Sequence, residues 1–477
     1  MNNIYQEFYS SITLLSFCCT SITAQQTEAI NCETTTKKPN IVFILADDMG
    51  INDLGCYGQR LIKTPNIDKL AAHGLQFINH YSGSTVSAPS RCCLLTGKDT
   101  GHAYIRGNEH VIINGDRFEY PLAASETTIA TILQKDGYAT ECVGKWGLGG
   151  PGTEGNPLKH GFDYFYGYLS QSAAHNYYPK RLFENDKSVT LDGKTYSHYL
   201  IMDKGLEFIK QHAKQPFFAY FAITLPHAAL DIPSLGKYAN KFEEVPFVNP
   251  DYKKDPYQYR SQPKPRAAYA AMVSEVDRSV DQIIQLLKKL GISKNTIIIF
   301  SSDNGVHTEG GNNPEFFNSN GLYRGYKRDL YDGGIHVPFI ISWPKYIHQA
   351  RKTKNISTFW DFLPTVCDIL SLPIPTETNG ISYLPTILNK PETQKQHDYL
   401  YYEFYEGGGK KCVLKDGWKL VELPIVPTQC TRFELYNLNT DISELHNVAK
   451  QNPNIVKQLQ EIMKKAHTDT KIFTYKE

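Results

Sequence analysis

Apolar runs of strand length, separated by helical patterns, constrain the fold of this chain more than any other feature. The first run, Asn40-Ile41-Val42-Phe43-Ile44-Leu45-Ala46, is almost continuously apolar, which is typical of a strand buried on both faces in a parallel sheet. Further strand candidates lie at 139–143, 217–223, 296–300 and 337–342. Between the candidates at 217–223 and 296–300, an apolar stripe at helical spacing runs from Ala267 to Leu290 and stops at Gly291. This alternation predicts an α/β fold with a large, mixed, mostly parallel sheet sandwiched by helices.

From about residue 396 the chain changes character. Short strand-like runs separated by Gly, Pro and Asp lie at 399–402, 411–414, 418–423 and 433–436, and a helical segment follows at 455–463. The pattern predicts a small C-terminal α+β subdomain with an antiparallel sheet over residues 396–477. The large domain before it is expected over residues 39–395.

The N-terminus has features of an export signal. An apolar stretch from Ile12 to Cys19 precedes Thr23-Ala24-Gln25, which predicts a signal peptide over residues 1–24 and a polar linker over 25–38. The stretch before it carries no Lys or Arg, and a lipid anchor at Cys18 is disfavoured by the bulky Phe17. No apolar run reaches the roughly 20 residues that a bilayer span requires. We therefore expect no transmembrane segment and an exported protein, periplasmic or, less favourably, lipid-anchored at the cell surface.

Charge and cysteine content exclude two broad classes of protein. Lys and Arg number 50 against 49 Asp and Glu, a net charge of +1, whereas nucleic-acid binding needs a clustered basic surplus. Ten cysteines among 477 residues are too few for a disulfide scaffold. A Cys412–Cys430 bridge is left open.

Polar residues follow four of the predicted strands, at the point where each strand ends. They are Asp47-Asp48, Gly144-Lys145-Trp146, Pro226-His227 and Asp303-Asn304. Each alone is explained by a cap, a turn or a core histidine. Because ligands bind at the carboxyl ends of strands in open α/β sheets, their coincidence predicts one site. The carboxylate and amide oxygens favour Ca²⁺ or Mg²⁺, and the nearby lysine and imidazole suit a phosphate or sulfate ester.

A second signal is the segment Ser87-Ala88-Pro89-Ser90-Arg91. Pro89 suits a first helical turn, which places Ser87 at a helix N-terminus, where free N–H groups favour an anion. Ser87 could equally be a plain N-cap. Arg91, one turn later, adds a bidentate oxyanion donor and favours chemistry.

At this point the sequence resembles the type I sulfatases of the alkaline phosphatase superfamily, from about Lys38 to Lys465. The stretches that carry the resemblance are Ser87-Ala88-Pro89-Ser90-Arg91 with Leu94-Leu95-Thr96-Gly97, Pro39-Asn40-Ile41-Val42 with Asp47-Asp48, Gly144-Lys145-Trp146, Ser302-Asp303-Asn304-Gly305 and Glu434-Leu435-Tyr436-Asn437-Leu438. The resemblance implies an alkaline phosphatase-like fold, with residues 39–395 as the catalytic domain. It also implies hydrolysis of sulfate esters on carbohydrates.

The resemblance further implies roles for individual residues. Ser87 would be oxidised to formylglycine by a sulfatase-maturating enzyme, and a hydroxyl of the hydrated aldehyde would attack sulfur. Ca²⁺, rather than Mg²⁺, would be held by Asp47, Asp48, Asp303, Asn304 and the modified residue 87. Arg91, Lys145 and Lys327 would neutralise the sulfate oxygens, and His227 would protonate the departing alcohol.

The sequence departs from the family pattern at Gly147, where many sulfatases carry a histidine that serves in the release of sulfate. A subset of bacterial sulfatases is similar in this respect and shares the stretch Thr100-Gly101-His102-Ala103-Tyr104-Ile105-Arg106-Gly107-Asn108. The hypothesis is that His102, or another residue of this stretch, takes over the role. A His102→Ala variant with full turnover would contradict it.

Substrate recognition is predicted from the loop Gln171–Pro179, which mixes polar and aromatic residues. Candidates for sugar contacts are His175, Asn176, Arg106, Asn108, Tyr323 and Arg324. The resemblance favours galactose or N-acetylgalactosamine units of host or dietary glycans, without fixing the sugar or the sulfate position. Two alternatives remain: a metal-dependent phosphomonoesterase or phosphodiesterase with unmodified Ser87, and a catalytically silent glycan-binding protein.

Overall fold

The computed structural model describes residues 38–254, 258–425 and 431–475. The predicted signal peptide and all of the predicted linker except Lys38 lie outside these residues, as does Cys430. Cys412 is buried in the C-terminal sheet. The bridge left open between Cys412 and Cys430 therefore falls partly outside the described residues. Among the described residues, no helix combines the length and the apolar character needed to cross a membrane.

A ten-stranded sheet forms the centre of the described chain. In spatial order its strands are β13 (Arg351–Thr353), β2 (Leu75–Phe77), β12 (Phe339–Ser342), β11 (Thr296–Ser302), β1 (Asn40–Ala46), β10 (Phe217–Ala222), β6 (Ala139–Lys145), β7 (Tyr164–Tyr168), β8 (Arg181–Glu184) and β9 (Lys187–Thr190). The five strands from β11 to β7 are parallel. β12 is antiparallel to both its neighbours, as is β8. The mixed, mostly parallel sheet is confirmed.

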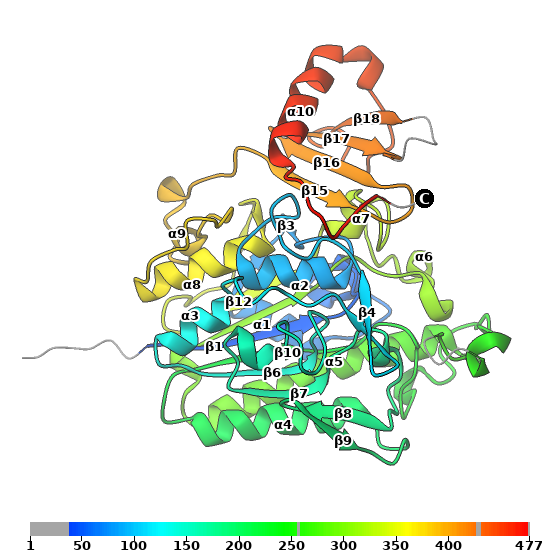
Figure 1. Ribbon diagram of the computed structural model, residues 1–477, viewed down its shortest axis with the longest axis vertical. Coiled ribbons are helices and arrows are strands. Elements are labelled where there is room, and N and C mark those ends of the chain that lie inside the picture. Colours follow the sequence, from blue (N-terminus) through cyan, green and yellow to red (C-terminus); the bar gives the residue numbers. More distant parts are fainter. Residues whose placement is uncertain (1–37, 255–257, 426–430, 476–477) are drawn as a thin grey trace, which may run out of the picture. The chain divides into compact units, whose positions relative to one another are not determined.

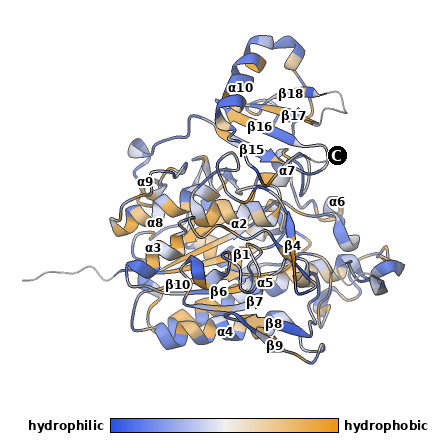
Figure 2. Cartoon of the chain, viewed as in Figure 1, coloured by the Kyte–Doolittle hydropathy of each residue, from blue (hydrophilic) through white to orange (hydrophobic). Residues whose placement is uncertain are grey.

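Helices cover both faces of the sheet (Figure 1), and this explains the apolar sequence of β1. All seven of its residues are buried. Ile41, Phe43 and Leu45 belong to the same core as α2 (Ser87–Thr96), α3 (Ile129–Lys135) and α8 (Phe362–Leu370). The alternate residues belong to the core of α1 (Pro65–Ala72), α4 (Ser197–His212) and α5 (Pro265–Lys289). Because successive strand residues point to opposite faces, a strand between two helical layers must be apolar throughout, and Figure 2 shows hydrophobic residues concentrated there.

The C-terminal segment forms a separate four-stranded antiparallel sheet, at the top of Figure 1. Its strands are β15 (Leu400–Phe404), β16 (Lys410–Lys415), β17 (Trp418–Leu423) and β18 (Arg432–Asn437). One face packs on α10 (Pro453–Ala466), through Leu459 and Met463. The predicted small α+β appendix is confirmed in its architecture.

Shorter elements complete the described chain. β3 (His80–Tyr81) pairs with β14 (Ser357–Thr358), and β4 (His110–Ile113) forms a hairpin with β5 (Asp116–Glu119). Three one-turn helices are α6 (Pro314–Phe317), α7 (Asp332–Ile335) and α9 (Leu384–Ile387). The β4–β5 hairpin matters below, because its last residue reaches a cavity at the carboxyl edge of the main sheet.

Candidate active site

Four adjacent parallel strands deliver polar residues to one edge of the main sheet. In spatial order β11 is followed by Asp303 and Asn304, β1 by Asp47 and Asp48, β10 by the loop that carries His227, and β6 ends at Lys145. All six side chains are buried, none more than 4% exposed. Parallel neighbours place their carboxyl ends side by side, which explains the convergence of residues distant in the sequence.

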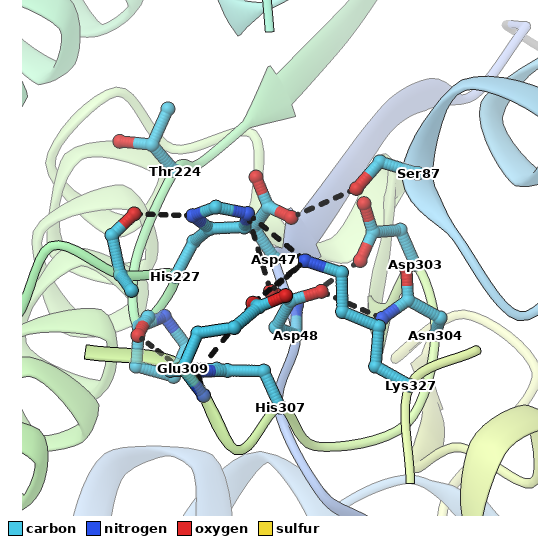
Figure 3. A network of polar contacts seen from close by, with 12 residues as sticks. Asp47, Asp48, Ser87, Thr224, His227, Asp303, Asn304, His307, Glu309 and Lys327 are labelled. Carbon is cyan, nitrogen blue, oxygen red and sulfur yellow. Dashed lines mark hydrogen bonds and ion pairs between the residues drawn. The ribbon is translucent and has the colours of Figure 1, made fainter. Parts of the chain in front are cut away.

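Ser87 is the first residue of α2 and faces this edge (Figure 3). Its hydroxyl lies 3.1 Å from Oδ1 of Asp47 and 3.2 Å from Nζ of Lys145. Nζ of Lys145 in turn lies 2.6 Å from Oδ2 of Asp47. The hydroxyl therefore sits between a carboxylate and an ammonium group, at the end of a helix where backbone N–H groups favour negative charge.

Arg91, one turn along α2, is locked in place by two partners. Its Nε and Nη2 donate to Oδ2 of Asp303 at 3.1 and 2.9 Å, and Nη1 donates to the carbonyl of Lys145 at 2.7 Å. Burial, with the nearby Asp47 carboxylate, raises the pKa of Asp303, while Arg91 opposes that rise. The guanidinium is thus held rigidly at 1% exposure.

Asp48 and Asn304 offer oxygen atoms suited to a cation. Nδ2 of Asn304 donates to Oδ1 of Asp48 at 2.7 Å, and its buried Oδ1 has no hydrogen-bond partner among the described residues. Asp48 adopts a left-handed backbone conformation, φ 62°, which is uncommon outside glycine and recurs at functional sites. Ligand atoms of Asp47, Asp48 and His227 lie within 4.8 Å of one another. An orphaned amide oxygen beside clustered carboxylates fits a divalent metal ion.

Lys327 connects Asp48 to His227. Its Nζ lies 2.9 Å from Oδ2 of Asp48, 3.1 Å from Nε2 of His227 and 3.0 Å from Oε2 of Glu309. Burial, and then the Lys327 charge, hold the pKa of His227 well below its usual value. The His175 ring stacks on the His227 ring with centroids 4.9 Å apart.

These groups open onto a cavity of about 340 Å³. Its lining includes Ser87, Asn108, Glu119, Gln171, His175, His227, Tyr259, Lys327 and Arg328. Charged, amide and aromatic side chains thus surround the Ser87 hydroxyl and the His227 imidazole. Such a cavity suits an anionic ester carried on a polar ring.

A family model for sulfatases matches residues 39–372. The chain belongs to the sulfatase family. Its chemistry is that of a sulfuric ester hydrolase, as the resemblance to the type I sulfatases implied. A second model, "N-sulphoglucosamine sulphohydrolase, C-terminal", matches residues 321–469.

Named sulfatases are similar over most of the chain. The chain is 30% identical to an N-acetylgalactosamine-6-O-sulfatase of Bacteroides thetaiotaomicron, over 91% of its own length and 94% of that protein. It is 32% identical to the N-acetylgalactosamine-6-sulfatase of Rattus norvegicus, over 73% of its own length and 66% of the rat protein. A solved structure titled Ps i-CgsB in complex with k-i-k-neocarrahexaose superposes with a TM-score of 0.74 at 26% identity, over 92% of this chain and 95% of that one.

Within the sulfatase site, two predicted substrate residues line the cavity. His175 lies there by its stacking on His227, and Asn108 lies there with a buried Oδ1 that has no partner in the described part of the chain. Asn176 faces a neighbouring cavity instead, and its Oδ1 accepts the backbone N–H of Tyr178 at 2.9 Å.

The structure does not bring the other four predicted residues to this cavity. Nδ1 of His102 lies 2.8 Å from Oδ1 of Asp99, and Nη1 of Arg106 lies 2.9 Å from Oε1 of Glu403. His102 is thus held by a partner within its own loop, and Arg106 by a partner in the C-terminal sheet.

Tyr323 and Arg324 also contribute elsewhere. The Tyr323 ring packs on His336 with centroids 4.3 Å apart and lines a cavity beside the C-terminal sheet. Nη1 of Arg324 donates to the Glu444 carbonyl at 2.8 Å, and its guanidinium covers the Tyr331 ring at 3.9 Å.

Sequence reasoning missed several residues in and around the sulfatase cavity. Glu309, which pairs with Lys327, follows Asp303-Asn304 after only a short loop, so a closer reading of that strand end was the available signal. Glu119 and Tyr259 come from a hairpin and a loop whose sequences carry no motif, and Gln171 begins the predicted recognition loop without having been named as a site residue.

Proposed function

We propose that the protein hydrolyses O-sulfate esters of galactose-type sugars, with 6-sulfated N-acetylgalactosamine as the first candidate. The observation that carries this is the Ser87 hydroxyl, held between Asp47 and Lys145 at the N-terminus of α2. The names of the bacterial and rat relatives support the sugar and the position.

A divalent cation, Ca²⁺ in preference to Mg²⁺, would be held by Asp47, Asp48, Asp303, Asn304 and residue 87. When bound, it would polarise the sulfate group and stabilise ionised oxygen. Ser87 is proposed to be converted to formylglycine by a sulfatase-maturating enzyme, which would supply a hydrated aldehyde as nucleophile. The unpartnered Oδ1 of Asn304 is the feature of this chain that supports the cation.

The cations of the site have separate tasks in this proposal. Arg91 and Lys145, both rigidly held, face the sulfate oxygens and compensate their charge as the ester bond breaks. Lys327 and His227 lie 3.1 Å apart in the cavity lining and are proposed to lie beside the leaving oxygen. His227 is proposed to deliver the proton to the departing alcohol.

The sugar ring is proposed to lie against His175 and Asn108, the two predicted substrate residues that line the cavity. A glycan substrate outside the cell is consistent with the export expected from residues 1–24. We therefore propose a periplasmic or surface-anchored enzyme of glycan degradation.

The test is desulfation of a panel of monosulfated galactose, N-acetylgalactosamine and glucosamine sugars by protein co-expressed with a maturating enzyme. We expect turnover of 6-sulfated N-acetylgalactosamine, loss of turnover with a chelator and recovery with Ca²⁺. Mass spectrometry of the peptide containing residue 87 should show the loss of two hydrogens that accompanies conversion to formylglycine.

Other outcomes distinguish the alternatives. Turnover of phosphate esters with an unmodified Ser87 would establish a phosphatase. Glycan binding without any turnover by the modified protein would establish a silent binding protein.

A further inference from the structure

Gln171 occupies the space beside Gly147 at the wall of the cavity. Gly147 follows two residues after Lys145 and adopts a left-handed conformation, φ 72°. A Cβ atom on residue 147 would lie 2.6 Å from Cγ and 2.9 Å from Nε2 of Gln171. The Gln171 side chain therefore fills the volume that any side chain at position 147 would need.

The backbone holds Gln171 at this point. β6 and β7 are parallel, with Lys145 opposite Tyr168, so the segments that follow both strands run side by side. The N–H of Gly147 donates to the carbonyl of Leu169 at 3.1 Å, and the N–H of Gln171 donates to Oε2 of Glu119 at 2.9 Å. Anchors on both sides fix the origin of the side chain.

The amide of Gln171 has unused hydrogen-bonding capacity. The residue is 8% exposed, and its buried Nε2 has no partner among the described residues. It lines the cavity that contains Ser87 and His227. A buried donor without a partner costs about 1–3 kcal/mol, so its presence in the lining of the cavity that contains Ser87 indicates a ligand.

We propose that the Gln171 amide donates a hydrogen bond to an oxygen of the sulfate group that reacts at residue 87. This deepens the proposed function and rests on it. The neighbouring donors Arg91 and Lys145 are cations already paired with Asp303 and Asp47. A neutral amide adds a donor that neither repels these cations nor takes up a proton, so it orients the sulfate group without changing the charge of the site.

The experiment compares Gln171→Met, which keeps the volume and removes the donor, with the parent enzyme on the sulfated sugar it turns over. We expect kcat and kcat/KM to fall together by about 10²-fold, with KM changed by less than about threefold. Gln211→Met, at an exposed position of α4, is the matched control and should match the parent.

A second variant, Gln171→Glu, gives a signature that space filling does not. Its carboxylate would repel the sulfate group, so its deficit relative to the parent should shrink as the pH falls and the carboxyl regains a donor. The ratio of parent to Gln171→Glu turnover, measured across pH, decides the question even where Gln171→Met lowers the melting temperature.

An active parent with a Gln171→Met variant within about threefold in kcat overturns the role of Gln171 alone. So does a loss carried by KM with kcat unchanged, which would indicate a contact to the sugar ring. A modified parent without any sulfate-ester turnover would instead remove the proposed function, and this inference with it.

Discussion

Two buried charge clusters in this molecule differ in one respect. The cluster around Arg106 and Glu403 joins the loop after α2 to the C-terminal sheet, and it is closed. Glu403 is fully buried and accepts hydrogen bonds from Arg106, Tyr401, Tyr405 and His467. Arg106 also donates hydrogen bonds to the carbonyl of Ala103 and to the carbonyl and hydroxyl of Thr468.

The cluster around Ser87 is equally buried but open. Oδ1 of Asn304 and Nε2 of Gln171 have no partners in the described residues, and a cavity of about 340 Å³ adjoins them. The comparison teaches that burial and ion pairing do not mark a functional site, whereas unused hydrogen-bonding capacity beside a cavity does.

The largest predicted effect breaks the open cluster. Asp303→Asn should lower kcat/KM by about 10⁴-fold, because the substitution both weakens the hold on Arg91 and removes a proposed metal ligand. Steady-state kinetics on the modified protein measures it, with Asp186→Asn, in an exposed turn, as control. Unchanged turnover would show that the chemistry does not depend on Asp303 and would place it elsewhere in the molecule.

A smaller effect on stability is expected from breaking the closed cluster. Arg106→Met leaves Glu403 buried without its cation, which should reduce the free energy of unfolding by about 3 kcal/mol. Although burial opposes it, His467 and Arg106 hold the pKa of Glu403 below its usual value, so the variant loses one of the groups that keep this buried carboxylate ionised. Chemical denaturation measures the loss.

The double variant Arg106→Met/Glu403→Gln sharpens this prediction. It should recover part of the lost stability, because no uncompensated charge remains. Activity per folded molecule should stay near the parent value in both variants. A selective rise in KM at unchanged stability would restore Arg106 as a substrate residue.

The smallest effect concerns His102, at the border of the closed cluster. Its hydrogen bond to Asp99 raises the pKa of the imidazole above 6.5. The raised pKa means that the pair stabilises the fold fully below about pH 6.5, and that this contribution disappears as the pH rises through the folded-state value. The imidazole side chain is 32% exposed, so the contribution should stay below about 1 kcal/mol.

His102→Gln should therefore lower the melting temperature slightly more at about pH 6 than at about pH 8.5. Thermal melts of parent and variant at the two pH values measure the difference. Turnover should be unchanged. A large loss of kcat at unchanged stability would return His102 to the reaction.

The sequence was most informative where one strand is buried on both faces. The run at 40–46 is β1 to the residue, and the helix expected over 267–290 is α5, Pro265–Lys289. β7 was missed, because Tyr164–Tyr168 is dominated by tyrosine and glycine, and the short strands β8 and β9 lie at the edge of the sheet. Apolar periodicity reports burial, and edge strands have little of it.

In the candidate site, residues at the ends of parallel strands were predictable from the sequence, whereas several residues on loops were not. Residues at or directly after strand ends, such as Lys145 and Asp47, were predicted because every parallel strand presents its carboxyl end at the same edge. Gln171 begins the loop predicted for recognition but was not named, because a loop sequence does not show which of its side chains face a cavity. His102 and Arg106, read from one motif, were assigned to the site although their partners lie elsewhere.

The sequence by itself determined the layered α/β architecture, the antiparallel C-terminal sheet and the set of polar residues at the strand ends. These depend on local patterns, since the period of apolar residues is set by the geometry of strands and helices. Only the tertiary structure decided which charges are closed by partners and which face a cavity. Arg106 and Glu403 are 297 residues apart, and such a contact leaves no trace in the pattern around either residue.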